Sequence, residues 1–127
     1  INDLIYVCGP APLQIGVATG IEELPDTYYS GLCQQYYEKR NKICAALNDA
    51  GITPYAPQGA YYVLADVSRL PGANSKERAM FMLKQIGVAA VPGSAFYSGD
   101  AGEKLVRFCF AKSEAALDEA CSRLRKL

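Results

Sequence analysis

The chain has 127 residues, half of them hydrophobic, and its 13 Lys+Arg balance its 13 Asp+Glu. That length and apolar content are typical of a compact domain with a real core and argue against disorder. A zero formal net charge, with acids and bases mixed along the chain, gives no electrostatic footprint for nucleic acid or an anionic membrane. The longest apolar runs, such as residues 89–91, fall far short of the roughly 20 residues that cross a bilayer.

Histidine is absent, which excludes a Ser-His-Asp triad, a Cys-His dyad or a histidine-based zinc site within this chain. The number of cysteines is odd and no two form a C-x-x-C pair. We expect reduced, mostly buried thiols in a cytoplasmic protein, at Cys8, Cys33, Cys44, Cys109 and Cys121. Because residue 1 is Ile and no leader pattern follows, we expect the chain to begin inside a longer protein.

The first 50 residues predict two helices. Glycines and prolines mark a loop before a short helix over residues 12–23. Asp26 is predicted to cap a helix that runs to about Ala50, with Gly51 as its stop. At 1.5 Å per residue this helix extends roughly 35 Å, enough to lead from one domain into another. Its prediction rests on apolar residues at three- and four-residue steps: Tyr29, Leu32, Tyr36, Ile43, Leu47 and Ala50.

From Gly51 onward the pattern changes to strands and shorter helices. Residues 54–57 indicate a loop or edge segment, and residues 59–66 a buried strand. Asn74 and Glu77 resemble a capping box that opens a helix ended by Gly87. The inward face of that helix is predicted to carry Ala79, Met82, Leu83 and Ile86.

The last third predicts two strands and a helix. The strands are expected over residues 88–91 and 105–111, joined by a glycine-rich loop over 92–102. Ser113 then caps a final helix, in which Glu119 stands four residues before Arg123. The inward residues of this helix are predicted to be Leu117, Ala120, Cys121 and Leu124.

These elements predict an α/β fold of the α+β small-domain kind. A small, mainly antiparallel sheet carries helices on one face and is preceded by a long interdomain helix. We expect residues 1–50 to be the tail of a larger domain with that helix, and residues 51–127 to be the small domain.

Arg107 is the most informative residue for function. Period two along residues 105–111 places it on one face with Leu105, Cys109 and Ala111. A permanently charged guanidinium among apolar neighbours needs a partner anion. Either it forms a structural ion pair, with Asp66 as a candidate, or its planar fork binds a ligand carboxylate.

The segment 91–97 and the loop after it could shape a ligand pocket or serve as a plain connection. No basic patch surrounds the tyrosines, so base stacking is not predicted. The acidic runs 22–23 and 118–119 are interpreted as solvated faces.

Several motifs together resemble the class I/II aminotransferases of pyridoxal-phosphate (PLP) fold type I, over almost the whole chain. They are Pro12-Leu13-Gln14, Gly59-Ala60-Tyr61-Tyr62 with Asp66, Gly87-Val88-Ala89, residues 91–97, Arg107-Phe108-Cys109-Phe110-Ala111, and Leu117 with Glu119-Ala120. Each motif alone is weak, and their order and spacing make the resemblance specific.

The resemblance implies a parent enzyme that transfers an amino group between an amino acid and a 2-oxo acid. The family's arginine for the substrate α-carboxylate falls on Arg107, and Tyr61, rather than Tyr62, is expected to line the pocket. The pattern is closest to family members acting on aromatic, sulfur-containing or glutamine-like amino acids.

The resemblance also implies what this chain lacks. The lysine that binds the cofactor covalently lies upstream in the family, and no lysine here has its context, so the chain alone is expected to be inactive. We therefore expect no catalytic, cofactor-binding or metal-binding residue in this chain.

The implied partners are an N-terminal large domain and a second subunit of a homodimer, with neither nucleic acid nor membrane. Two alternatives stay open: a stand-alone binding module, and a fragment of a related PLP lyase or decarboxylase.

Overall fold

The computed structural model describes residues 9–127, which divide between Cys33 and Gln34 into two compact units. Cys8 lies outside the described residues. The second unit holds the sheet, and the division falls within α3, so the predicted domain boundary after residue 50 stays a prediction.

The first unit contains helix α2 (Ala11–Glu23) and the start of α3 (Asp26–Asp49). Helix α2 begins with a proline in its first turn and buries none of its residues. Its apolar side chains therefore face solvent, and Leu13, Ile15 and Ile21 are each 68% exposed. Asp26 is the first residue of α3 and not its cap, so that prediction was wrong, although a carboxylate in the first turn still favours the helix dipole.

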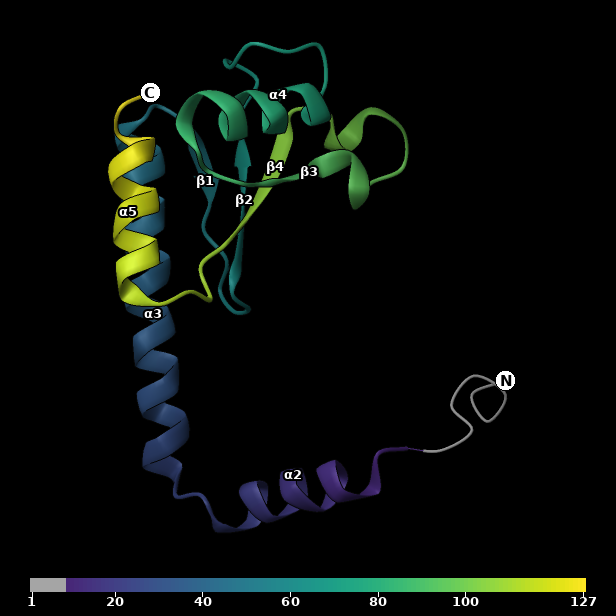
Figure 1. Cartoon of the computed structure of the whole chain (residues 1–127), viewed down its shortest axis with the longest axis vertical. Helices are drawn as coiled ribbons and strands as arrows, with labels where there is room; N and C mark the ends of the chain where they lie inside the picture. The colour runs from purple at the N-terminus through teal and green to yellow at the C-terminus, as the bar shows by residue number, and fades with distance from the viewer. Residues whose placement is uncertain (1–8) are drawn as a thin grey trace. The chain divides into compact units, whose positions relative to one another are not determined.

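Four strands form one antiparallel sheet in the order β1-β2-β4-β3, which confirms the predicted fold class. Their bounds are β1 Thr53–Tyr55, β2 Tyr62–Asp66, β3 Val91–Pro92 and β4 Leu105–Cys109. Strand β4 lies between β2 and β3, as Figure 1 shows. The central position of β4 gives its side chains neighbours on both flanks.

Helices cover one face of this sheet. Along β2 and β4 burial alternates: Val63, Ala65, Val106 and Phe108 are buried, while the residues between them are half-buried. The covering elements are the second half of α3, α4 (Ser75–Phe81) with the π-helical turn Met82–Ile86, and α5 (Glu114–Leu124). The opposite, more open face carries Arg107.

Helix α5 lies alongside the second half of α3 (Figure 1). Its buried residues are Leu117, Cys121 and Leu124, and Ala120 packs at the margin of the core, as predicted. Ser113 caps it by accepting a hydrogen bond from the Ala116 amide, and Arg123 Nε lies 2.7 Å from Glu119 Oε1.

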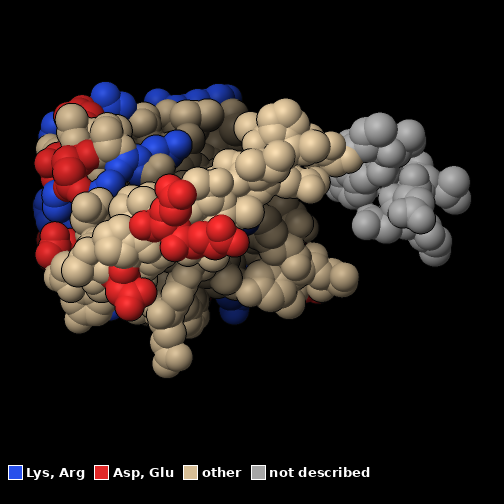
Figure 2. All heavy atoms as spheres, turned by 90° about the horizontal axis from the view of Figure 1, so that it is seen from below, with Lys and Arg blue, Asp and Glu red and all other residues tan. Residues whose placement is uncertain are grey.

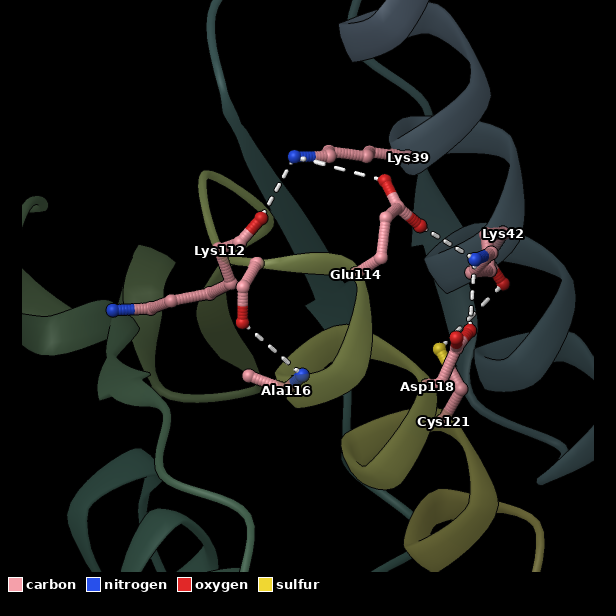
Figure 3. A network of polar contacts seen from close by, with 8 residues as sticks. Lys39, Lys42, Lys112, Glu114, Ala116, Asp118 and Cys121 are labelled. Carbon is pink, nitrogen blue, oxygen red and sulfur yellow. Dashed lines mark hydrogen bonds and ion pairs between the residues drawn. The ribbon is translucent and has the colours of Figure 1, made fainter.

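An exposed polar network also links these two helices (Figure 3). Lys42 Nζ lies 2.8 Å from both Glu114 Oε2 and Asp118 Oδ1, and Lys39 Nζ donates to the Lys112 carbonyl oxygen. The two carboxylates raise the pKa of Lys42, and Lys42 in turn lowers the pKa of Glu114. Because these groups face water, they add little to the docking of the helix.

Some predicted boundaries were wrong for local reasons. Strand β2 begins at Tyr62 and not at residue 59, because Ala60 adopts a left-handed backbone with φ 63° that interrupts an extended run. Strand β3 pairs only through Val91 and Pro92, and proline offers no amide to extend the ladder. Strand β4 ends at Cys109 rather than residue 111, although the Phe110 amide still donates to the Tyr61 carbonyl oxygen at 3.0 Å.

Leu83 was predicted to face inward and is 46% exposed. The π-helical turn that follows α4 holds more residues than an α-helical turn, which shifts later residues around the axis. The Asn74 cap is confirmed, since its side chain accepts from the Glu77 amide at 2.9 Å, and Gly87 ends the turn with φ 72°.

The described cysteines are free, as predicted: Cys33, Cys44, Cys109 and Cys121. The expectation that most are buried was wrong, because only Cys121 among these four is fully buried. Burial raises the pKa of the Cys44 and Cys121 thiols, which keeps both protonated near neutral pH.

Acidic and basic residues both occur on the face shown in Figure 2, and neither sign covers it. Among residues 9–127, no helix combines the length and hydropathy that a membrane span requires.

Candidate functional site

The candidate site is the open face of β4 around Arg107. In the sheet register Arg107 stands opposite Leu64 of β2 on one side and Val91 of β3 on the other. Tyr62, two positions from Leu64, shares this face and pairs with Cys109. The period-two prediction for β4 therefore placed Arg107 correctly.

Arg107 does not pair with Asp66. Asp66 Oδ1 instead accepts a hydrogen bond from the Ser68 amide at 2.8 Å, and hydrogen bonds from Ser68 lower the pKa of Asp66. Within residues 9–127, no carboxylate lies within ion-pair distance of Arg107. The structural ion pair considered from the sequence is therefore absent from the described chain.

The Arg107 guanidinium is instead covered by aromatic rings. Its Cζ lies 4.0 Å from the ring centroid of Tyr62 and 4.1 Å from that of Phe96. Its Nε is buried without a hydrogen-bond acceptor among the described residues. A buried donor left unpaired costs about 1–3 kcal/mol, and no group among the described residues offsets this cost.

Tyr61, the other predicted site residue, precedes β2. Its side chain is 44% exposed, and its ring centroid lies 4.2 Å from that of Tyr62. Hydrogen bonding with Tyr61 is the main cause that raises the pKa of Tyr62, because it stabilises the protonated phenol. Tyr61 is thus connected to Arg107 through Tyr62.

From the sequence, Tyr61 was preferred over Tyr62, and neither Tyr62 nor Phe96 was predicted to contact Arg107. Tyr62 could have been found by pairing residues 62–66 with 105–109, because period two then puts it on the same face as Arg107. No comparable signal identifies Phe96, since it follows β3 in an irregular segment (Gly93–Ala95, then Gly99–Gly102, both 3-10 helices).

The described part of the chain contains no cluster of three potential metal ligands from His, Cys, Asp or Glu. Its lysines also offer no enclosed site. Lys39 and Lys42 contact carboxylates on α5, and the remaining lysines are exposed: Lys76, Lys84, Lys104, Lys112 and Lys126.

Comparison with known proteins identifies the class to which this fold and site belong. The family model for aminotransferase class I and II matches residues 1–124. The chain belongs to this family.

Individual relatives agree with that assignment. The methionine aminotransferase of Escherichia coli strain K12 is 34% identical over 116 residues, which cover 91% of this chain and 30% of that protein. Kynurenine–oxoglutarate transaminase 3 of Rattus norvegicus is 33% identical over 134 residues, covering 91% of this chain and 29% of that protein. The chain therefore spans about 30% of the length of these relatives.

Solved structures share the fold. An E. coli protein with a methionine aminotransferase function superimposes with a TM-score of 0.86 at 31% identity, over 98% of this chain and 32% of that one. N-succinyldiaminopimelate aminotransferase from Mycobacterium tuberculosis gives a TM-score of 0.85 at 32% identity, again over 98% and 32%.

Proposed function

We propose that this chain is the C-terminal part of a PLP-dependent enzyme that transfers an amino group between an amino acid and a 2-oxo acid. Within it, Arg107 binds the substrate α-carboxylate and Tyr61 lines the pocket. The observation that carries this proposal is the Arg107 guanidinium, which has no acid partner among the described residues and a buried, unpaired Nε.

The chemistry of the group fits a carboxylate. A guanidinium offers two parallel N–H donors in one plane, which match the two oxygens of a carboxylate. The aromatic rings beside Arg107 replace part of the water around it, and the lower local dielectric strengthens its attraction for an anion. The names of the relatives, which include methionine and kynurenine–oxoglutarate transaminases, support amino transfer over a lyase reaction.

The residues of this chain do not fit PLP itself, because the described lysines are exposed or held by carboxylates. We place the cofactor and its lysine in the longer parent, within an N-terminal large domain, and expect that parent to be a homodimer. The free thiols support a cytoplasmic location.

The proposal is tested in the full-length parent by Arg107→Lys. Loss of the planar fork should reduce transition-state stabilisation by about 2–5 kcal/mol, measured as kcat/KM for the amino acid. Arg125→Lys is the matched control, because Arg125 pairs with Asp49 on the surface and should leave kcat/KM unchanged. An unaltered kcat/KM in Arg107→Lys would refute carboxylate binding by this residue.

A second prediction concerns the 127-residue chain alone. When it is mixed with PLP, we expect neither the absorbance band of a lysine-bound cofactor nor transaminase activity, since no described lysine is enclosed. Absorbance titration and a coupled assay check this, and a saturable band would show that the chain holds a cofactor site of its own.

A further inference from the structure

Two aromatic rings, those of Tyr62 and Phe96, lie against the Arg107 guanidinium. Both centroids lie about 4 Å from Cζ, at 4.0 Å for Tyr62 and 4.1 Å for Phe96. The N–H groups of a guanidinium project from the edge of its plane, which is where an anion binds.

The rings come from segments on either side of β4. Tyr62 is on β2, diagonal to Arg107 in the register, while Phe96 follows β3, whose Val91 is paired with Arg107. Phe96 is 44% exposed and does not belong to the hydrophobic core. Its contact with Arg107 is therefore not a by-product of core packing.

The backbone that carries Phe96 is held in place. Ser75, fully buried at the start of α4, donates from Oγ to Ser94 Oγ at 3.0 Å. Gly93 packs so closely against Gly102 that a Cβ at either position would collide with the other's backbone. The Phe96 amide then donates to the Gly93 carbonyl oxygen at 2.9 Å. These contacts hold the backbone from which the Phe96 ring projects.

We propose that Tyr62 and Phe96 are positioning residues for substrate binding: they hold the Arg107 guanidinium in one plane, so that only its edge meets the substrate carboxylate. Arginine stacks on aromatic faces, and a guanidinium already fixed in its plane loses less freedom when it binds. This inference rests on the proposed function and deepens it.

The test uses the full-length parent and compares Phe96→Leu and Tyr62→Leu with wild type. Each loss of a ring should raise KM for the amino acid, and the inhibition constant of 3-phenylpropionate, by about three- to thirty-fold, with kcat largely kept. Phe96→Tyr and Tyr62→Phe retain the ring and should stay close to wild type. Tyr37→Leu is the matched control, because its ring contacts a different arginine, Arg40, at 4.4 Å.

A readout without catalysis guards against misfolded variants. In the 127-residue chain, NMR should show that Phe96→Leu moves the Arg107 Nε–H resonance, because the ring current on it is lost, whereas Tyr37→Leu should not. An unmoved resonance in Phe96→Leu would overturn the stacking.

The outcomes also separate the two proposals. Unchanged KM and inhibition constants in both leucine variants, beside a large effect of Arg107→Lys, overturn the positioning role alone. A fall in kcat without a rise in KM marks a merely structural role and overturns it too. If Arg107→Lys leaves the inhibition constant unaltered, carboxylate binding by Arg107 itself fails.

Discussion

Asp66 accepts hydrogen bonds from Ser68 and does not form an ion pair with Arg107. The hydrogen bonds from the Ser68 side chain and amide stabilise the ionised carboxylate, which lowers its pKa below the usual value near 3.8. Asp66 and Ser68 are only two residues apart, so their contact costs little conformational entropy. An ion pair with Arg107 on the neighbouring strand would require the long Arg107 side chain to be ordered as well.

This carboxylate gives the chain a pH-dependent stability. Because the folded pKa is lowered, the unfolded state binds the proton more readily, and the contribution of Asp66 is present above the unfolded pKa and lost as pH falls through the folded one. We expect Asp66→Asn to reduce the drop in the free energy of unfolding between neutral pH and about pH 3, measured by urea denaturation. An equally steep drop in the variant would show that other carboxylates dominate.

The docking of α5 on α3 depends on apolar burial rather than on the ion network. Leu117 is 2% exposed and packs in the core, while Lys42 and its acidic partners face water. We expect Leu117→Ala to lower the free energy of unfolding by about 2–5 kcal/mol, as for other buried leucines.

Lys42→Met is the comparison for this element, since it removes both ion pairs and keeps much of the aliphatic stem. Its effect should be much smaller than that of Leu117→Ala and should shrink further at high salt. Urea midpoints at unchanged m-value measure both variants. A larger loss in Lys42→Met would mean that the network, and not the core, holds the helix.

Patterns among residues close together in the sequence predicted the helices and strands well. Apolar spacing located α3 and α5, and the side chains of Asn74 and Ser113 marked helix starts because a cap bonds only a few residues ahead. Features that depend on tertiary contacts were not predictable. The left-handed Ala60 shortens β2, the π-helical turn exposes Leu83, and Phe96 reaches Arg107 only once β3 and β4 are paired.

At the scale of the whole molecule, the buried core begins at Ile43, and the described chain before it exposes most of its large apolar side chains. Helix α2 buries nothing, and Tyr29 and Leu32 at the start of α3 are also about two-fifths exposed, at 39% and 40%. Tyr36, further along the same helix, packs against the core near Phe110.

We therefore expect the 127-residue chain to self-associate through its N-terminal helix, because a large exposed apolar surface on a soluble chain favours association. Val17→Lys, at a residue 62% exposed on α2, should shift the chain towards monomer in sedimentation velocity. Thr19→Lys adds the same charge to a polar position of this helix and should change the distribution less. Equal effects of the two variants would point to net charge as the cause.

The tight approach of Gly93 to Gly102 has a consequence for which sequences this fold can accept. Both residues are buried although the segment between them is largely exposed, and even a methyl group at either would force two backbones apart. In a library of all single amino-acid replacements selected for folding, variants at Gly93 and Gly102 should be lost as severely as variants of the hydrophobic core. Most variants at the neighbouring Ala95 and Ala101 should be retained. If Gly93 and Gly102 reject replacement while the residues between them accept it, the cause is the close approach of these two backbones, which also positions the segment that carries Phe96.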